Sequence, residues 1–253
     1  MISDTVMALE TKFSRLARQQ HLVPETIWET GPDAIRVWTR DSDSGNALRI
    51  FISAGIHGDE PCGPEALLQF LETHELSRAC HWAIAPILNP WGLKNGKREN
   101  ASGIDLNRDF LQKQSEEIRA ITQWWENQNQ GCDLHLSLHE DWETDGLYLY
   151  EINTGKLPPL GERILHNLPD FIPRQIKGPV DGHDLSAPGL ILHEPEPDEA
   201  FGWPEAIWLA KRSPILSITL EAPGQISRHE RTACLLASLT AAVSEAESIP
   251  RSD

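Results

Sequence analysis

Residues 48–60 read Leu-Arg-Ile-Phe-Ile-Ser-Ala-Gly-Ile-His-Gly-Asp-Glu, and this stretch does most to decide the fold. Its first nine residues form an apolar run with the length and composition of a buried β-strand. The run ends at His57, and Glu60 follows three positions later in a turn rich in glycine and proline. Both side chains should therefore lie at the carboxyl end of a strand. An imidazole and a carboxylate placed there could bind one divalent cation, although the pattern alone is equally typical of a solvated loop.

Helical and strand-like segments alternate along the rest of the chain. Amphipathic or Ala/Leu-rich patterns predict helices at residues 3–20, 60–73, 113–129 and 226–247. Apolar runs bounded by turn residues predict strands at residues 35–38, 48–56, 81–88, 132–139, 147–151 and 214–220, with a turn at 89–92. This alternation predicts an α/β sandwich around a largely parallel or mixed sheet. Because no repeat, low-complexity tract or linker interrupts it, residues 1–253 are predicted to form a single domain.

Composition and charge narrow the class of protein. The net charge of −16 is spread along the chain, which argues against nucleic acid or an anionic membrane as a partner. Residues 1–20 lack the basic and apolar regions of a signal peptide, and no apolar run is long enough to span a bilayer. The four cysteines are scattered without a Cys-x-x-Cys pair, which favours reduced, packed thiols. These features predict a cytoplasmic protein and leave its oligomeric state open.

A long loop at residues 89–110, between a predicted strand and a predicted helix, carries two arginines. Arg98 and Arg108 could present guanidinium groups to anions, and Asn107 could add a hydrogen-bond donor beside Arg108. Loops held by a rigid scaffold often carry functional residues. The alternative is a surface loop whose arginines pair with its own acids, Glu99, Asp105 and Asp109. The loop alone fits both interpretations.

Residues 133–139 alternate leucines on one face with His135, Ser137 and His139 on the other. The two histidines are separated by about 13 Å of strand, so both cannot ligate one ion through bonds of about 2 Å. His139 lies at the carboxyl end, where open α/β sheets bind ligands. His139 is therefore the predicted ligand, and His135 is predicted to be a hydrogen-bonded interior histidine. The opposite assignment, with His135 as the ligand, remains the alternative.

Residues 214–220 are predicted to form another apolar strand, and Glu221 lies at its end, just before Pro223 and Gly224. Such a carboxylate should again reach the carboxyl edge of the sheet. Near a metal-bound water it could serve as a general base. An ordinary glutamate at the end of a strand is the alternative.

Taken in order, these segments resemble the M14 family of zinc metallocarboxypeptidases, and above all its short, single-domain bacterial members. The matching motifs are Gly-Ile-His-Gly-Asp-Glu at 55–60, Asn-Pro-x-Gly leading into Arg-x-Asn-x-x-Gly-Ile-Asp-Leu-Asn-Arg-Asp-Phe at 98–110, Leu-Ser-Leu-His at 136–139 and Thr-Leu-Glu at 219–221. The resemblance implies a three-layer α/β/α sandwich with a mixed sheet of roughly eight strands.

The resemblance also implies a set of functional residues. One zinc ion would be bound by a water molecule and three protein ligands, His57, Glu60 and His139. Arg98 would polarise the scissile carbonyl and hold the oxyanion. Asn107 and Arg108 would bind the terminal carboxylate of the substrate. Glu221 would activate the zinc-bound water and then protonate the leaving amine. These roles agree with the general chemistry of zinc sites and of cationic oxyanion donors.

The sequence departs from the digestive members of the family in one respect. Those enzymes use a mobile tyrosine over the substrate, whereas Tyr148 and Tyr150, the two tyrosines here, fall in a predicted strand. No residue at the base of the specificity pocket can be identified. The segment 178–203 is predicted to shape the entrance. Its acids at 194–199 could attract a cationic side chain or form a solvated loop.

Three functions are compatible with these residues. The favoured one is a zinc metallocarboxypeptidase-type hydrolase that cleaves a peptide or amide bond beside a free carboxylate. An N-acyl amino acid amidohydrolase of the succinylglutamate desuccinylase/aspartoacylase type shares the zinc set. Those enzymes usually carry a further β domain, whereas only 32 residues follow Glu221 here. A non-catalytic, ligand-binding pseudopeptidase is the third, disfavoured because every ligand and the base are present. A small peptide or an N-acyl amino acid is the expected substrate.

Overall fold

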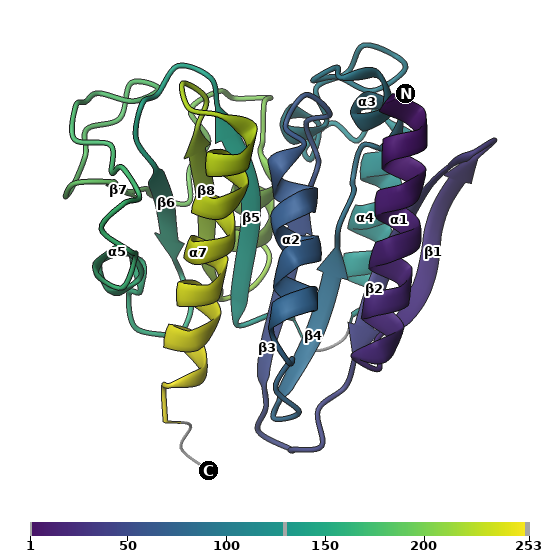
Figure 1. Cartoon of the computed structure of the whole chain (residues 1–253), viewed down its shortest axis with the longest axis horizontal. Helices are drawn as coiled ribbons and strands as arrows, with labels where there is room; N and C mark the ends of the chain where they lie inside the picture. Colours follow the sequence, from purple (N-terminus) through teal and green to yellow (C-terminus); the bar gives the residue numbers. More distant parts are fainter. Residues whose placement is uncertain (1, 129–130, 251–253) are drawn as a thin grey trace.

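The computed structural model describes residues 2–128 and 131–250, and its strands form one mixed sheet of eight strands (Figure 1). The sheet has the order β1-β2-β4-β3-β5-β8-β6-β7. The strands are β1 (Val23–Thr30), β2 (Asp33–Arg40), β3 (Leu48–Ala54), β4 (Cys80–Ala85), β5 (Leu134–Asp141), β6 (Tyr148–Asn153), β7 (Leu190–Leu192) and β8 (Leu216–Pro223).

The centre of the sheet is parallel, and each flank joins it through an antiparallel pair of strands. Strands β4, β3, β5 and β8 run parallel to one another, whereas β2 runs antiparallel to β4 and β6 antiparallel to β8. The four central strands therefore end at the same edge of the sheet. The loops that follow β3, β5 and β8 meet there, which brings distant chain segments together.

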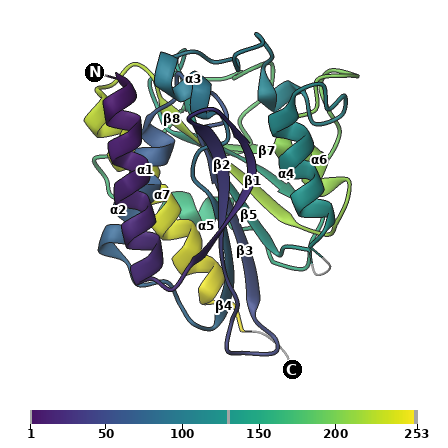
Figure 2. The same cartoon turned by 90° about the vertical axis from the view of Figure 1, so that its right-hand side faces the viewer.

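Helices cover both faces, which gives three layers (Figure 2). α1 (Ile2–Gln19), α2 (Cys62–Thr73), α5 (Gly161–His166) and α7 (Arg228–Glu247) lie on one face. α4 (Glu116–Glu126) and α6 (Glu205–Ala210) lie on the other, and α3 (Pro90–Asn95) lies beside the edge where the parallel strands end. The predicted three-layer α/β/α fold with a mixed sheet of about eight strands is confirmed.

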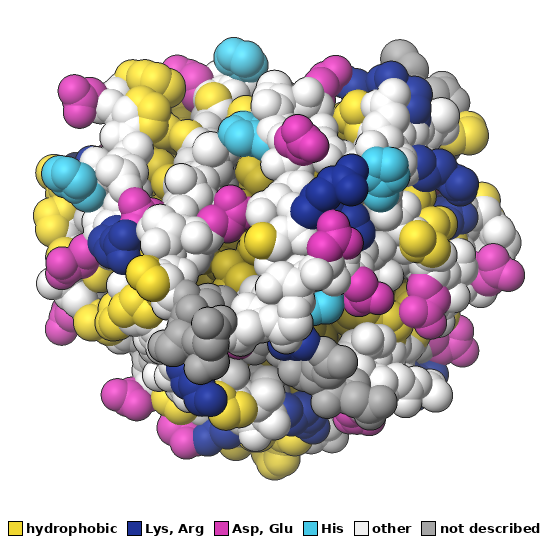
Figure 3. Space-filling view, turned by 90° about the horizontal axis from the view of Figure 1, so that it is seen from below, with side chains coloured by type: hydrophobic (Ala, Val, Ile, Leu, Met, Phe, Trp, Pro, Cys, Tyr) yellow, Lys and Arg dark blue, Asp and Glu magenta, His cyan; other side chains and the backbone are white. Residues whose placement is uncertain are grey.

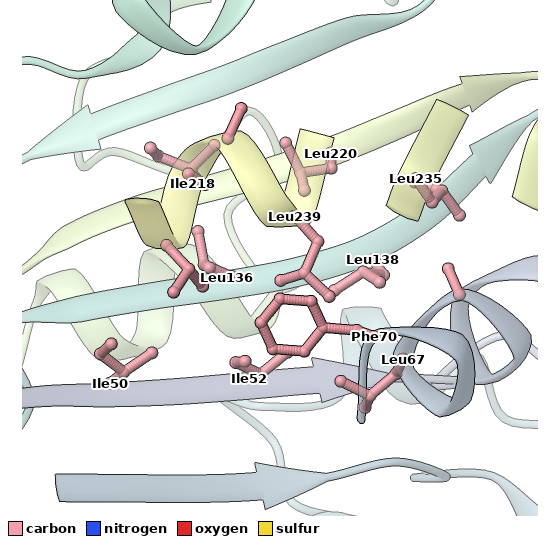
Figure 4. Close-up of a cluster of buried hydrophobic side chains, with 14 of the residues drawn as sticks. Ile50, Ile52, Leu67, Phe70, Leu136, Leu138, Ile218, Leu220, Leu235 and Leu239 are labelled. Carbon is pink, nitrogen blue, oxygen red and sulfur yellow. The ribbon is translucent and has the colours of Figure 1, made fainter. Parts of the chain in front are cut away.

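The larger core lies between the sheet and the pair α2–α7. Figure 4 shows Ile50 and Ile52 of β3 and Leu136 and Leu138 of β5 facing Phe70 of α2. Full burial of each such side chain contributes about 1.5–3 kcal/mol to stability. A second, aromatic-rich core lies under α4 and α6, where Phe51, Phe110, Trp124, Trp125 and Trp208 pack together. Both cores hold the central strands rigidly beneath the loops at their carboxyl ends.

Several elements differ from the sequence-based predictions. β1 was not predicted, because it is a largely exposed edge strand without an apolar run. α5, α6 and β7 also escaped prediction, since they contain only six, six and three residues. The predicted turn at 89–92 is the start of α3, with Asn89 as its N-cap and Pro90 at its first position.

The described residues contain no helix long and apolar enough to cross a membrane. Acidic and basic side chains are mixed over the face seen from below in Figure 1, at the end of the molecule opposite the loops that follow the parallel strands (Figure 3). The net charge of −16 is therefore not concentrated on that face. That residues 1–253 form a single catalytic domain stays a prediction.

Candidate active site

Three side chains, two from a loop and one from a strand, converge at the carboxyl edge of the sheet. His57 and Glu60 lie between β3 and α2, and His139 lies near the end of β5; all three are buried. Glu60 Oε1 is 2.6 Å from Nδ1 of His57, and Glu60 Oε2 is 3.0 Å from Nδ1 of His139. Two imidazole nitrogens and a carboxylate can therefore reach a single ion. This donor set suits zinc.

The outer nitrogens of both rings have partners of their own. Nε2 of His57 lies 3.2 Å from Oδ1 of Asp105, and Nε2 of His139 lies 3.0 Å from Oγ of Ser137. Histidines that bind metal usually donate the proton of their second nitrogen to such a group, which fixes the ring and its tautomer. Both Nδ1 atoms are thus the ones that face the common centre.

Charge coupling is strong within this group. Burial alone would raise the pKa of Glu60, but the two imidazoles lower it below its ordinary range. Burial alone would lower the pKa of His57, but Glu60 and the hydrogen bond to Asp105 raise it. The centre therefore holds Glu60 as a carboxylate, the form that binds a cation.

The loop that carries His57 and Glu60 is held against α3 by backbone contact. A Cβ atom added to Gly58 would lie 1.9 Å from the carbonyl carbon of Gly92, so only glycine fits there. The side chain of Asn89 accepts a hydrogen bond from the Gly92 amide and donates one to the carbonyl of Arg98. The same contacts therefore position the two candidate ligands and the start of the arginine loop.

Arg98 lies beside the candidate ligands. Its Nε donates to Oδ2 of Asp105 at 3.0 Å, and its Nη1 is 3.4 Å from Oε1 of Glu60. Arg98 therefore does pair with an acid of its own loop, Asp105, as the alternative interpretation predicted. The pairing does not remove Arg98 from the site, because its guanidinium still lines the cavity described below. Asp105 thus holds both Arg98 and His57 in place.

Asn107 and Arg108 follow in a short 3₁₀ turn. The side-chain oxygen of Asn107 accepts a hydrogen bond of 3.0 Å from the amide of Glu205, so its NH₂ group is the donor that it can offer elsewhere. Arg108 donates to the carbonyl of Asn107, and it takes part in none of the ion pairs found among residues 2–128 and 131–250. This pair of adjacent donors can therefore meet an external carboxylate.

Glu221 is adjacent to His139, because the two residues pair in register between β8 and β5. Ser217, Thr219 and Glu221 alternate along β8 and all face the cavity. Burial, together with the negative charges of Glu60 and Asp141, raises the pKa of Glu221 well above its ordinary value. A carboxylate of raised pKa next to a metal centre can exchange a proton with a reacting group.

His135 lies in a buried polar network rather than in the cavity. Its Nδ1 is 2.8 Å from Oγ of Ser217, and its Nε2 is 3.2 Å from Oγ of Ser53 and 3.4 Å from Oε2 of Glu205. His135 is fully buried, and the nearby imidazole lowers the pKa of Glu205 although burial acts in the opposite direction. The structure thus places His139, and not His135, beside His57 and Glu60.

All seven site residues predicted from the sequence line one cavity of about 500 Å³. They are His57, Glu60, Arg98, Asn107, Arg108, His139 and Glu221. The opposite wall comes from β6 and from the segment 178–203, which the sequence placed at the entrance. A volume of this size accommodates a small peptide or an acylated amino acid.

Residues 46–159 match the family described as succinylglutamate desuccinylase/aspartoacylase catalytic domain. Carboxypeptidase SOL1 of Arabidopsis thaliana is 34% identical over 90 residues, which cover 27% of this chain and 18% of that protein. Murein peptide amidase A of Escherichia coli K12 is 35% identical over 98 residues, which cover 39% of this chain and 36% of that protein. The chain thus matches only a minor part of these relatives.

The fold matches solved structures over nearly its whole length. A protein of Shewanella baltica described as a metallopeptidase has a TM-score of 0.83 at 21% identity, with 96% of this chain and 93% of that chain covered. Solved metallo-carboxypeptidases share the fold as well. Over residues 46–159 the chain is thus similar to the succinylglutamate desuccinylase/aspartoacylase catalytic domain, and its fold is that of the metallocarboxypeptidases. Its resemblance to the M14 family is confirmed.

The structure also shows residues lining the cavity that the sequence analysis did not identify. Tyr148 and Tyr150 of β6 both line the cavity, and their hydroxyl groups donate to Asp141 and Asp181. The sequence located both tyrosines in a strand but gave no sign of which face they occupy. The sequence analysis considered Asp105 only as a partner of an arginine. Its position in the motif Asp-Leu-Asn-Arg, two residues before Asn107, could have indicated a role in the site.

The raised pKa of Glu221 should make the stability of the metal-free form depend on pH. A carboxyl group whose pKa is raised on folding contributes stability that is present below its unfolded pKa, about 4.3, and is lost as pH rises through its folded pKa. Glu221→Gln should therefore raise the melting temperature of chelator-treated protein at pH 8, and much less at pH 4.5. For a chain of this size, each kcal/mol in the free energy of unfolding shifts the melting temperature by about 2–4 °C.

Thermal unfolding of both variants at the two pH values measures this effect. Glu29→Gln, at an exposed glutamate of β1, provides the control for loss of one surface charge. An equal difference at both pH values would show that ionisation of Glu221 does not destabilise the metal-free fold.

Proposed function

We propose that the protein is a zinc-dependent metallocarboxypeptidase-type hydrolase that cleaves a peptide or amide bond beside a free carboxylate. One observation carries the proposal: seven residues from four distant segments line a single cavity, and they include three potential metal ligands as well as the adjacent donors Asn107 and Arg108. His57, Glu60 and His139 would hold one zinc ion. The four free, buried cysteines fit the reducing cytoplasm, which we propose as its location.

The residues of the chain would divide the reaction between them. A bound zinc ion would supply Lewis acidity for the carbonyl and lower the pKa of water. Arg108 and the NH₂ group of Asn107 would hold the terminal carboxylate and so position the scissile bond. Arg98 would donate to the carbonyl oxygen as negative charge develops on it, which stabilises the transition state. Glu221 would take a proton from the attacking water and return it to the leaving nitrogen as the C–N bond breaks.

The most direct experiment combines metal analysis with a substrate screen. Purified protein should contain zinc at His57, Glu60 and His139, and it should release an amine from at least one of three classes: short peptides, murein peptides or N-acyl amino acids. A chelator should stop the release, and added zinc should restore it. Zinc-loaded protein that hydrolyses none of the three classes would instead support the alternative of a ligand-binding pseudopeptidase.

A second hydrolase function has an observation in its favour. The family match over residues 46–159 is to a catalytic domain named for a desuccinylase and an aspartoacylase, which points to N-acyl amino acids as substrates. The same cavity residues would serve this reaction. Release of free amino acid from N-acyl amino acids, without cleavage of peptides, would favour this alternative over the peptidase.

Replacing Arg108 by Ala tests the carboxylate-binding role. A charged hydrogen-bonding pair contributes about 1.5–3 kcal/mol, so kcat/KM should fall by about 10- to 100-fold on substrates with a free carboxylate. Substrates whose carboxylate is amidated should react equally with wild type and variant. Arg108→Lys keeps the positive charge but not the planar guanidinium group, so its kcat/KM should fall less than that of Arg108→Ala. Equal losses on both kinds of substrate would contradict the proposed contact.

A further inference from the structure

A second group of potential metal ligands lies on the wall of the cavity opposite the proposed zinc ligands. His183, His193 and Asp198 all belong to the segment 178–203, and all line the cavity. None of them has a part in the proposed hydrolysis. Their ligand atoms lie within 4.8 Å of one another. The segment therefore brings two imidazoles and a carboxylate to one point.

The spacing of these atoms suits an ion. Nε2 of His183 is 3.3 Å from Oδ2 of Asp198, and Nε2 of His193 is 3.5 Å from Oδ1 of the same residue. Charged hydrogen bonds between nitrogen and oxygen are usually about 2.7–2.9 Å long. Ligand atoms at about 2.0–2.1 Å from a tetrahedral zinc ion lie about 3.4 Å apart. The observed separations therefore match two ligands of one zinc ion better than they match a charged hydrogen bond.

The hydrogen bonding of His193 also favours an ion between its ring and Asp198. Its Nδ1 is 2.5 Å from the carbonyl oxygen of Glu194, and a carbonyl oxygen can only accept, so Nδ1 carries a proton. In the neutral ring Nε2 then has a lone pair that faces an oxygen of Asp198. Two acceptors that face each other repel unless a proton or a metal ion lies between them, and the separation of 3.5 Å is longer than a charged hydrogen bond. A backbone carbonyl on the outer nitrogen is also a usual arrangement for a histidine that binds metal.

The surroundings hold the two rings in place. The amide of His193 donates to the carbonyl of Glu151 on β6, at 2.9 Å, and the backbone of His183 exchanges two hydrogen bonds with Val180. The ring of Tyr150 packs edge-on against both imidazoles, with centroids 5.8 and 6.0 Å away. The side chains of His183 and His193 are 24% and 11% exposed, so an ion can enter from the cavity.

We propose that His183, His193 and Asp198 form a second zinc-binding site at the wall of the cavity, separate from the centre at His57, Glu60 and His139. Three protein ligands would leave one position of a tetrahedral ion open to the cavity. The ion would link Asp198, in an exposed loop, to two positions anchored against the sheet. Bound zinc would thus order the part of the wall that the substrate meets.

Zinc stoichiometry tests the site without reference to activity. Metal-free full-length protein, titrated with Zn²⁺ and followed by elemental analysis and calorimetry, should bind two equivalents. Asp198→Asn and His193→Ala should each bind one equivalent with unchanged affinity. At the second site they should bind at least about 100-fold more weakly, since loss of even an outer partner of a ligating histidine costs about 10- to 100-fold. His229→Ala, at an exposed histidine of α7, should still bind two.

The outcomes separate this site from the proposed catalytic centre. His139→Ala should also bind one equivalent, and the double variant His139→Ala/Asp198→Asn should bind none. The second site is refuted if wild type binds a single equivalent, or if Asp198→Asn and His193→Ala both bind two. Asp198→Asn is nearly isosteric at a side chain that is 66% exposed, so the test does not depend on how well His193→Ala folds.

Discussion

Glu221→Gln should abolish turnover and leave zinc in place. Glutamine has nearly the same shape as glutamate but cannot take a proton from water or return it to the leaving nitrogen. A positioned general acid or base contributes about 10²- to 10⁴-fold to the rate, so kcat should fall by that factor. Because Glu221 is not among the three residues that converge on the proposed ion, zinc content should equal that of the wild type.

Steady-state kinetics and elemental analysis of the same preparation measure both parts of this result. Glu143→Gln is a matched control, since Glu143 also lines the cavity but has no assigned role. It should retain most of the activity. Full activity in Glu221→Gln would remove Glu221 from the mechanism, and loss of zinc would make it a ligand instead of a base.

His139→Ala should lose the zinc ion of the proposed catalytic centre, and with it all activity that depends on that ion. Two protein donors remain in that variant, whereas zinc sites of enzymes keep three. His135→Ala should retain the metal, because His135 hydrogen-bonds to Ser53 and Ser217 inside the protein and lies away from the cavity. It should instead lose about 1–3 kcal/mol of stability, since buried Glu205 and Ser217 would lose a partner.

Zinc affinity and thermal unfolding of the two variants give opposite signatures. His139→Ala should bind zinc weakly at this centre with a modest change in the melting temperature of the metal-free form. His135→Ala should bind it normally but unfold at a lower temperature. A reversed result, with zinc lost from His135→Ala alone, would reassign the third ligand.

The central strands were predictable because they are buried on both faces. Residues 48–56 and 132–139 are continuous or alternating apolar runs, and burial keeps such runs as strands wherever they occur. β1 was not predictable in this way, because it is held as a strand by hydrogen bonds to β2 and not by burial of its own side chains. α6 has only six residues, and it is fixed by Asn107, 98 positions earlier in the chain.

The candidate ligands were recognisable because the sequence keeps them in compact motifs at the ends of strands. His57 and Glu60 lie three positions apart, and Glu221 lies three positions before the turn that begins at Gly224. The cavity wall formed by Tyr150, His183 and His193 carries no such motif, since Tyr150 of β6 precedes the two histidines of the segment 178–203 by 33 or more residues and meets them only in the folded chain. Contacts made by folding across long loops leave no periodicity to detect.

The bare backbone contact between Gly58 and Gly92 has a consequence for how specificity can change. Since no side chain separates the two segments, the ligand-bearing turn and the arginine-bearing stretch cannot shift independently, and the reactive groups are already aligned before any substrate arrives. New preferences for substrate would then arise more readily in residues 178–203, which contribute to the cavity wall and contain no glycine packed as closely against backbone as Gly58 is against Gly92. Variation in this protein's relatives, or by design, is expected to concentrate there while the catalytic half stays constant.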